Sequence, residues 1–276
     1  FTPLADSCLV ATKAGLVFGG DDPKIDVGKV SSASVFIGNS SSHAVLFQIV
    51  YNAGAFQKYT IEMTPPLIRI RPQMAIEFRF DLTPNCMCKV DDTIALLYKV
   101  IASSKQNTVQ FPVAFETVIS TRIDIGEIDI ERRIGEGSFG VVFKGTYRGN
   151  KVAVKYVKQT SGDKREMDEF EKEVGMLDKF RSDHIVHFYG ACFVPTKVCM
   201  VTELAGYGSL QDMFENERIP IETLRVKFVL DAAKGIEYLH ANGILHRDIK
   251  PDNVLVFSLD EHAEVNAKLT DFGSSR

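Results

Sequence analysis

Two segments near the C-terminal end of the sequence carry side chains suited to metal binding and proton transfer. Residues 246–253 read HRDIKPDN, and residues 271–273 read DFG, beginning 18 residues after Asn253. Carboxylate and amide oxygens are ligands that Mg²⁺ prefers. A carboxylate can also accept the proton of an attacking hydroxyl group. Together the two segments contain what phosphoryl transfer requires of a protein, which is positioning and charge more than covalent chemistry.

A third segment, residues 134–142, is rich in glycine and reads IGEGSFGVV. The glycines at the spacing G-x-G-x-x-G are Gly135, Gly137 and Gly140. Glycines let a strand and turn bring backbone amides over phosphates without side-chain clash, whereas a dinucleotide-binding site would need a helix directly after them. Residues 141–147 and 151–157 are β-branched and alternating, with a turn at 148–150. The sequence therefore predicts a hairpin after the glycines.

Lys155 lies in the second strand of that hairpin, in a stretch that reads VAVKYV. A lysine in an apolar strand is costly unless it meets anions, and phosphate oxygens with a carboxylate would supply them; a surface lysine is the alternative. Residues 163–180 have apolar side chains at three- and four-residue steps, which predicts a helix. Glu173 stands beside that stripe and can face Lys155, with Glu169 and Glu171 as the competing carboxylates.

Residues 201–210 read VTELAGYGSL, an apolar strand that breaks into a linker of small residues. Such a linker exposes backbone N–H and C=O groups, with which the edge of an adenine ring can pair. A helix is then predicted over residues 224–240 from the spacing of its apolar side chains. Its expected inward-facing set is Val226, Phe228, Val229, Ala233, Ile236 and Leu239.

Five motifs in this order, over residues 134–273, resemble the protein kinase family. The resemblance implies ATP and Mg²⁺ as cofactors. It implies that Asp248 is the catalytic carboxylate, which accepts the proton of the substrate hydroxyl, and that Asn253 and Asp271 bind Mg²⁺.

The resemblance also implies how the nucleotide is held. Lys155 would hold the α- and β-phosphates and pair with Glu173, and the three glycines would cover the triphosphate. The adenine ring would lie between apolar side chains of Val142, Ala153 and Leu255. The residues that pair with the edge of the ring would be Glu203 and Ala205. Thr202 would guard the pocket behind the ring, and Ile134 completes the nucleotide-binding set.

Lys250, two residues after Asp248, resembles the Ser/Thr class, in which a lysine there acts in catalysis by neutralising the γ-phosphate. Residues 188–192, which read FYGAC, and the Thr-Glu pair at 202–203 resemble the tyrosine-kinase-like group, which is mostly Ser/Thr-specific. Dual specificity therefore stays open. Arg247 would pair with a phosphate on the activation loop; an arginine held by backbone carbonyls is the alternative.

The N-terminal part of the chain has the patterns of β-strands. Ile76, Phe78, Phe80 and Leu82 alternate with polar residues, which places the apolar set on one face of a sheet. About seven such runs predict a β-sandwich. Residues 37–41, 47–49, 59–61 and 70–72 resemble the immunoglobulin-like sandwich of the major sperm protein family, which acts through protein contacts; a generic sandwich is the alternative.

The expected fold is thus an all-β, immunoglobulin-like sandwich at residues 1–119, a linker at 120–127, and a protein kinase domain at 128–276. The kinase part would be α+β, with a complete small lobe and an incomplete large lobe, because the family continues beyond the Asp-Phe-Gly motif with an activation loop and further helices. We expect a fragment of a longer, active kinase that transfers phosphate poorly by itself.

Composition excludes several classes of function. The net charge of −4 and the absence of a basic half argue against nucleic acid as a partner. The five cysteines predict reduced core thiols, with Cys86 and Cys88 as the one candidate redox or metal pair. No apolar run approaches the about 20 residues of a membrane-spanning helix. We expect a cytoplasmic location, and an upstream membrane segment stays open because the sequence begins with Phe1.

These observations predict a protein serine/threonine kinase that transfers the γ-phosphate of Mg-ATP to hydroxyl groups of a protein substrate. The sandwich would bind a protein partner or regulate the kinase across the short linker. The alternative is a catalytically incompetent nucleotide-binding and protein-interaction module. The presence of Lys155, Asp248 and Asp271 favours the enzyme.

Overall fold

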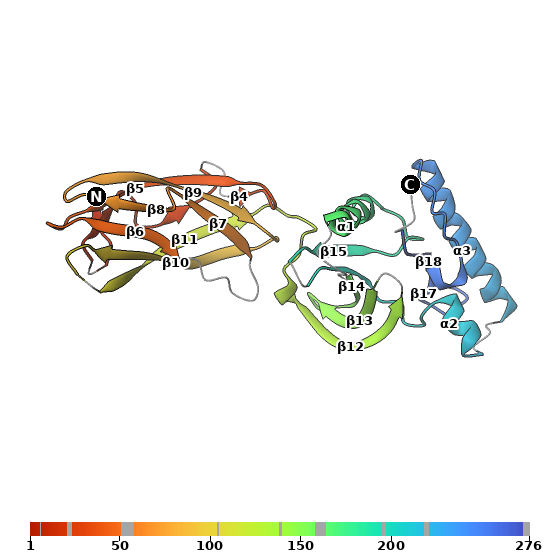
Figure 1. Cartoon of the computed structure of the whole chain (residues 1–276). Coiled ribbons are helices and arrows are strands. Elements are labelled where there is room, and N and C mark those ends of the chain that lie inside the picture. The colour runs from red at the N-terminus through yellow and green to blue at the C-terminus, as the bar shows by residue number, and fades with distance from the viewer. Residues whose placement is uncertain are drawn as a thin grey trace. The chain divides into compact units, whose positions relative to one another are not determined.

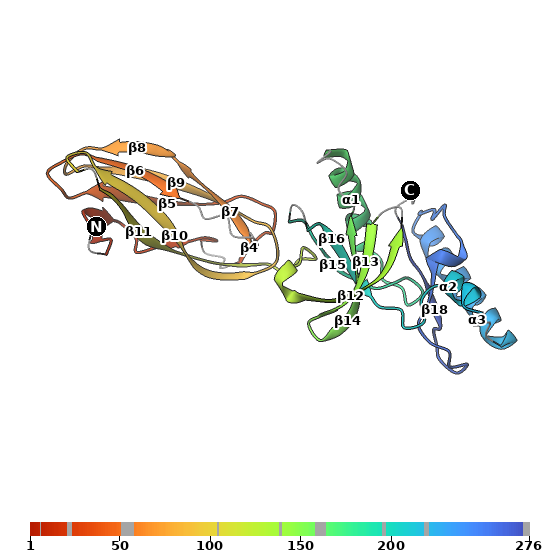
Figure 2. The same cartoon turned by 60° about the horizontal axis from the view of Figure 1, so that its bottom comes forward.

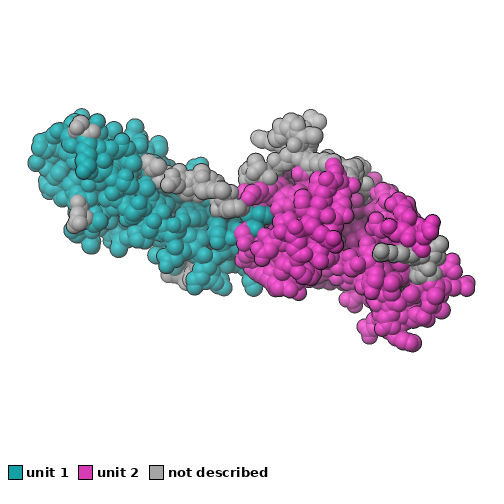
Figure 3. Space-filling model, turned by 90° about the horizontal axis from the view of Figure 1, so that it is seen from below, with its two compact units in different colours: residues 1–125 teal, residues 126–276 magenta. Residues whose placement is uncertain are grey.

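The computed structural model describes residues 1–5, 7–20, 24–50, 58–103, 105–137, 140–157, 164–194, 197–217 and 221–272. The chain divides into two compact units, residues 1–125 and 126–276 (Figures 1 and 3). Each unit has its own buried core of apolar side chains. The prediction that the N-terminal part is rich in strands and the C-terminal part mixes strands and helices is confirmed.

Unit 1 consists of two β-sheets that share one core. The strands of the first sheet, in spatial order, are β1 (Thr2–Pro3), β2 (Leu9–Ala11), β5 (Ser31–Asn39), β9 (Ala75–Pro84) and β7 (Tyr59–Thr64). The strands of the second are β3 (Leu16–Val17), β11 (Gln106–Thr117), β10 (Lys89–Val100), β6 (Val45–Val50) and β8 (Leu67–Ile70), with β4 (Lys24–Ile25) also paired to β11. The long strands pair antiparallel, and Figure 2 shows them running along the length of the unit.

Apolar and polar side chains alternate along β9, and the apolar ones lie on its buried face. Phe78, Phe80 and Leu82 are fully buried, while Glu77 before them and Arg79 among them are exposed. The ring of Phe78 lies 4.9 Å from the ring of Phe47 in the opposite sheet, so the two sheets meet through these side chains. Sequence reasoning expected about seven strands. The described part of unit 1 has eleven, because β1 to β4 are pieces of two or three residues, too short to show a period.

The segment expected to be a linker, residues 120–127, is partly anchored in unit 1. Ile123 is buried, and the carboxylate of Asp124 lies 3.0 Å from the ammonium of Lys58. The N–H of Met87 donates to the carbonyl oxygen of Arg122 over 2.7 Å. A short 3₁₀ helix, Ile125–Glu127, follows at the division between the units.

Unit 2 begins with an antiparallel sheet of five strands. In spatial order these are β12 (Ile128–Gly137), β13 (Gly140–Tyr147), β14 (Asn150–Val157), β16 (Cys199–Glu203) and β15 (Phe188–Cys192). The predicted hairpin after the glycines is confirmed as β13 and β14. Helix α1 (Lys164–Leu177) packs three apolar side chains into the core of this unit: Phe170, Val174 and Leu177.

The rest of the described part of unit 2 contains two further α-helices, a 3₁₀ helix and a two-stranded ribbon. Their bounds are α2 (Leu210–Glu215), α3 (Glu222–Ala241), the 3₁₀ helix Pro251–Asn253, β17 (Val254–Val256) and β18 (Ala267–Leu269). Among the described helices, none is long and apolar enough to cross a membrane.

The face of α3 that packs inward differs from the expected one. Val226 and Val229 are 63% and 68% exposed and Ala233 is also exposed, whereas Phe228 and Leu239 are buried as expected. The contact with β18 decides the face: a Cβ added at Gly235 would lie 2.8 Å from Leu269 Cδ1 and 2.9 Å from the carbonyl oxygen of His184. The stripe of apolar side chains read from the sequence was too wide, because it ignored this close backbone approach.

We predict that Phe78→Ala lowers the free energy of unfolding of unit 1 by about 3–5 kcal/mol, because it leaves a cavity between the two sheets. The matched control is Phe36→Ala on the neighbouring strand, where the ring is 44% exposed and the expected loss is below about 1 kcal/mol. Urea unfolding followed by circular dichroism measures both. Equal losses in the two variants would contradict the packing described here.

Candidate active site

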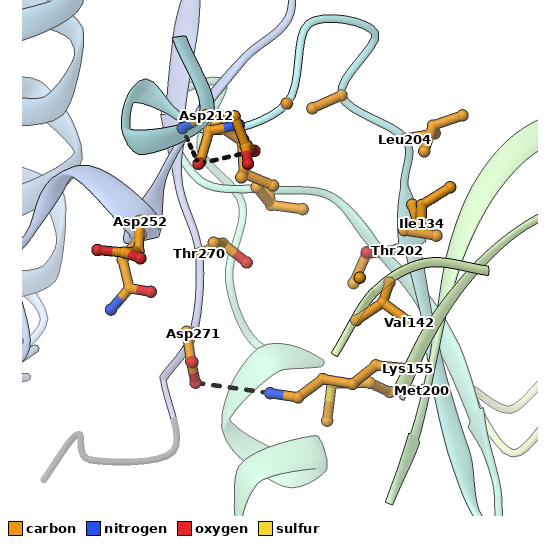
Figure 4. A pocket seen from close by; sticks show the side chains of 18 of the residues that line it. Ile134, Val142, Lys155, Met200, Thr202, Leu204, Asp212, Asp252, Thr270 and Asp271 are labelled. Atoms are coloured by element: carbon orange, nitrogen blue, oxygen red, sulfur yellow. Dashed lines mark hydrogen bonds and ion pairs between the residues drawn. The ribbon is translucent and has the colours of Figure 1, made fainter. Parts of the chain in front are cut away.

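A cavity of about 730 Å³ lies within unit 2 and is lined by both its sheet and its ribbon (Figure 4). Its lining includes most of the residues expected to bind nucleotide or act in catalysis: Ile134, Gly135, Gly140, Val142, Ala153, Lys155, Glu173, Thr202, Ala205, Lys250, Asn253, Leu255 and Asp271. In Figure 4, Ile134 and Val142 lie on one side of the cavity, and Thr270 and Asp271 lie on the other. Residues that are far apart in the sequence therefore meet around one space.

The glycine segment spans the end of β12 and the start of β13. Gly137 and Gly140 are paired across the turn, and residues 138 and 139 lie outside the described residues. A Cβ added at Gly140 would lie 1.9 Å from the carbonyl oxygen of Tyr156, so only glycine fits there. No such contact surrounds Gly135, where a Cβ would meet nothing within 4 Å. The side of Gly135 that faces the cavity is thus free to accept a bulky group.

Three charged side chains from three elements meet at one end of the cavity. Lys155 comes from β14, Glu173 from α1, and Asp271 from the segment after β18. The Lys155 ammonium lies 3.6 Å from the carboxylate of Asp271, and Figure 4 shows the two side chains pointing toward each other. Burial raises the pKa of Glu173; the Lys155 charge opposes this rise and the negative charge of Asp271 adds to it.

The loop of residues 246–253 holds a second charged group. Lys250 Nζ lies 2.8 Å from Asp248 Oδ2, and Asn253 Nδ2 donates to the same oxygen over 3.0 Å. The hydrogen bond from Lys250 holds the pKa of Asp248 below its usual value; desolvation opposes this effect, and the hydrogen bond from Asn253 adds to it. Asp248 itself is not among the residues that line the cavity, but its two partners are.

Two residues of this region have backbone torsions that are unusual for a residue with a side chain. Arg247 has a φ of 63° and Asp271 has a φ of 60°. Such torsions persist where the surroundings hold them. The Nε2 of His246 donates to the carbonyl oxygen of Thr270 over 2.9 Å, and its ring lies 5.1 Å from that of Phe272. This contact joins the two loops that carry Asp248 and Asp271.

The other end of the cavity is apolar. Val142, Ala153 and Leu255 line it, and Thr202 lies directly across from Ala153 in the ladder between β14 and β16. Met200, which also lines the cavity, lies directly across from Lys155 in the same ladder. The side chain of Glu203, which was expected among the nucleotide-binding residues, is directed elsewhere: it accepts hydrogen bonds from the backbone N–H of His187 and from Lys268, both at 2.7 Å. The backbone N–H of Glu203 is also used within the protein, because it donates to the carbonyl oxygen of His187 over 3.0 Å.

Sequence reasoning missed several lining residues, among them Leu204, Gly206, Asp212 and Asp252. Asp212 has a recognisable signal. Ser209 and Asp212 form a capping box at the start of α2, in which the Ser209 hydroxyl accepts from the Asp212 N–H and the Asp212 carboxylate accepts from the Ser209 N–H. The spacing Ser-x-x-Asp before a helix indicates such a box.

The donor set fits Mg²⁺ together with a triphosphate. Asn253 and Asp271 offer hard oxygen atoms at the cavity. Across the described residues, no group of three or more His, Cys, Asp or Glu side chains could hold a metal ion. Mg²⁺ is commonly held by one or two protein ligands together with phosphate oxygens and water.

Residues 128–276 match the family described as protein kinase domain. The chain belongs to the protein kinase family. One relative is a probable serine/threonine-protein kinase, gdt8, from Dictyostelium discoideum, which is 34% identical over 254 residues. That alignment covers 90% of this chain, so it extends into unit 1, and 19% of gdt8.

Two other relatives match over a shorter part of the chain. The probable serine/threonine-protein kinase drkB of Dictyostelium discoideum is 41% identical over 55% of this chain and 22% of its own length. A putative serine/threonine-protein kinase/receptor, R831, of Acanthamoeba polyphaga mimivirus is 42% identical over 56% of this chain and 9% of its own length. The chain thus spans less than a quarter of each of these relatives.

We predict that Glu173→Gln raises the melting temperature at pH 7, because it removes a carboxylate whose pKa is raised by burial. A group whose folded pKa lies above its ordinary value of 4.5 contributes its stability below that pH and loses it as the pH rises through the folded pKa. The gain should therefore shrink as the pH falls toward 4.5. Thermal melts at several pH values measure it, with the exposed Glu171→Gln as the matched control. A gain independent of pH would contradict this account.

Proposed function

We propose that unit 2 binds Mg-ATP in this cavity and that the γ-phosphate is transferred to serine and threonine hydroxyl groups of protein substrates. The observation that carries the proposal is the convergence of Lys155, Asp271, Asn253 and Lys250 on one cavity that also has an apolar part, with Asp248 paired to Lys250. The apolar end suits an adenine ring, and the charged end suits a triphosphate with its metal.

Each side chain has a role that follows from its place. The Lys155 ammonium meets the α- and β-phosphates, and the carboxylate of Glu173 interacts electrostatically with that ammonium. Asn253 and Asp271 would hold Mg²⁺, which neutralises charge on the phosphates when it is bound. Asp248 accepts the proton of the attacking hydroxyl group, since its lowered pKa keeps it ionised at neutral pH.

The specificity for serine and threonine rests on Lys250. Its ammonium lies 2.8 Å from Asp248, so it is placed to meet the γ-phosphate as that group approaches the proton acceptor. The hydrogen bond to Asp248 raises the pKa of Lys250, and this effect outweighs the opposing effect of desolvation. Lys250 therefore stays positively charged. The relatives named as probable serine/threonine kinases support this class. The sequence of β15 favours the tyrosine-kinase-like group within it.

We predict that Asp248→Asn and Lys155→Met affect different steps: Asp248→Asn slows phosphate transfer, and Lys155→Met weakens Mg-ATP binding. Asp248→Asn removes the proton acceptor, and transfer to a mixture of serine and threonine peptides should fall by about 10²–10⁴-fold while Mg-ATP affinity changes little. Lys155→Met removes the cation that meets the phosphates, so the affinity itself should fall by about tenfold or more. Calorimetric titration with Mg-ATP and incorporation of labelled phosphate measure the two steps.

The controls are Asp183→Asn and Lys172→Met, which change exposed residues of the same unit outside the cavity. Both should bind nucleotide as the original chain does. A Lys155→Met variant with unchanged affinity for Mg-ATP would refute the proposed nucleotide site. Transfer by Asp248→Asn at the original rate would refute the proposed role of that carboxylate.

Unit 1 supports a second function, in which the sandwich binds a protein partner and regulates the kinase. Its resemblance to the major sperm protein and immunoglobulin-like sandwiches favours a role through protein contacts. The anchoring of residues 122–124 on unit 1 is the observation that favours regulation: Asp124 pairs with Lys58, and Arg122 accepts from Met87. Because this segment leads directly into β12, a change in unit 1 has a short covalent path to the nucleotide site.

We predict that Lys58→Met changes the affinity of the chain for Mg-ATP if unit 1 regulates unit 2. The substitution removes the ammonium that lies 3.0 Å from the carboxylate of Asp124, whose side chain is only 9% exposed, and so weakens the anchoring of this segment. Lys89→Met is the matched control, because that lysine is 81% exposed and lies 3.9 Å from its partner Glu116. Identical affinities in the original chain and both variants would count against regulation through this segment.

A further inference from the structure

The side chain of Glu203 joins two segments of unit 2 behind the adenine end of the cavity. Glu203 ends β16 and directly precedes the linker of residues 204–208. Its Oε1 accepts from the backbone N–H of His187 and from the ammonium of Lys268, each at 2.7 Å. Its own backbone N–H donates to the carbonyl oxygen of His187 over 3.0 Å. Both the backbone and the side chain of the residue before the linker are therefore held.

The Glu203–Lys268 ion pair is shielded from solvent. The side chains are 20% and 18% exposed, and the Lys268 ammonium also lies 4.9 Å from the centre of the Phe257 ring. An ion pair in such a place is screened by salt less than an exposed one. Each charge also depends on the other, because an unpaired charge away from water is costly. The pair is thus a stable contact, unlike the exposed ion pairs on the surface of the same unit.

The other end of the pair leads to the metal-binding end of the cavity. Lys268 lies in β18, three residues before Asp271. The backbone of β18 is bound to the segment that contains His187: the N–H of Leu269 donates to the oxygen of His184, and the N–H of Val186 donates to the oxygen of Leu269, both over 2.9 Å. One hydrogen-bonded network therefore connects the start of the linker to β18, the strand that leads to Asp271.

We propose that Glu203 and Lys268 are positioning residues, which keep the linker at residues 204–208 and the carboxylate of Asp271 at a fixed separation. This inference rests on the proposed nucleotide site. The side chains of Glu203 and Lys268 do not line the cavity. They act through the backbone of the linker, which pairs with adenine, and through Asp271, which faces the triphosphate and its metal.

A nucleotide that uses both ends of the cavity depends on their separation more than a ligand that uses one end. Mg-ATP contacts the linker and the region of Asp271, whereas adenosine contacts only the linker and the apolar walls. If the linker and Asp271 are held at a fixed separation before binding, Mg-ATP does not have to offset the entropy lost in ordering the two ends of the cavity. The pair should therefore contribute to Mg-ATP affinity and little to adenosine affinity.

The test compares Lys268→Met with the original chain by calorimetric titration with Mg-ATP and with adenosine. We expect Lys268→Met to weaken Mg-ATP binding about tenfold and adenosine binding less than about threefold. Lys268→Arg keeps the positive charge and should restore Mg-ATP affinity to within about threefold. Lys151→Met is the matched control, since Lys151 is an ion-paired strand lysine of the same unit that is 59% exposed.

Two results would overturn the proposal. One is an equal loss of affinity for Mg-ATP and adenosine, which would indicate general destabilisation. The other is unchanged affinity for both. Glu203→Gln provides a second variant that keeps the hydrogen-bond acceptor for His187 and removes only the charge; it should weaken Mg-ATP binding more than adenosine binding, and a uniform effect would again contradict the proposal.

A measurement without nucleotide separates this inference from the proposed function. Hydrogen–deuterium exchange at the backbone amides of His187 and Glu203 should be faster in Lys268→Met than in the original chain, and unchanged in Lys151→Met, because both amides belong to the network. If the original chain binds no Mg-ATP, the proposed function fails for this chain. In that case the exchange rates alone decide, and equal rates in Lys268→Met and the original chain would overturn the positioning role.

Discussion

A lysine charge inside an apolar sheet has to be met by anions, and the active end of unit 2 is arranged around that constraint. Lys155 is 24% exposed and faces Asp271, while Glu173 lies on the same cavity. The raised pKa of Glu173 shows that burial outweighs the attraction of the lysine there. Two carboxylates around one ammonium leave this end of the cavity with an excess of negative charge. A triphosphate would add to that excess, so it can be accepted only together with a cation such as Mg²⁺.

The three charges meet because three separate packing arrangements hold their elements. The apolar side of α1 packs into the core of unit 2, which brings Glu173 to the sheet. The position of Asp271 depends on β18, and β18 is approached so closely by α3 that no side chain fits at Gly235. The hydrogen bond from His246 to Thr270 then ties the segment of Asp271 to the loop of Asp248. The chemistry of the site therefore rests on contacts that are themselves apolar or backbone-mediated.

Unit 1 follows a simpler physical rule, because its strands alternate between a buried and an exposed face. Phe78 and Phe80 enter a core shared by two sheets, and the polar residues between them remain at the surface. Residues 122–124 extend this unit beyond the boundary expected from composition, because Ile123 is buried and Asp124 is paired with Lys58. Because the apolar residues of this segment show no regular spacing, the sequence predicts a linker there, although single side chains such as Ile123 and Asp124 anchor it to unit 1.

The sequence by itself determined the features that depend on local order along the chain. The alternation in β9, the hairpin of β13 and β14, and the order of the motifs from Gly135 to Asp271 could all be read from residue types and spacing, since period and turn chemistry are properties of neighbouring residues. The tertiary structure alone decided which face of α3 is buried, that the Glu203 carboxylate turns to Lys268 and away from the cavity, and that Lys155 pairs with Asp271. These outcomes depend on residues 65 or more positions apart, or on backbone approaches such as that at Gly235. No local pattern records such contacts, because they arise only when separate elements compete for the same space and the same charges.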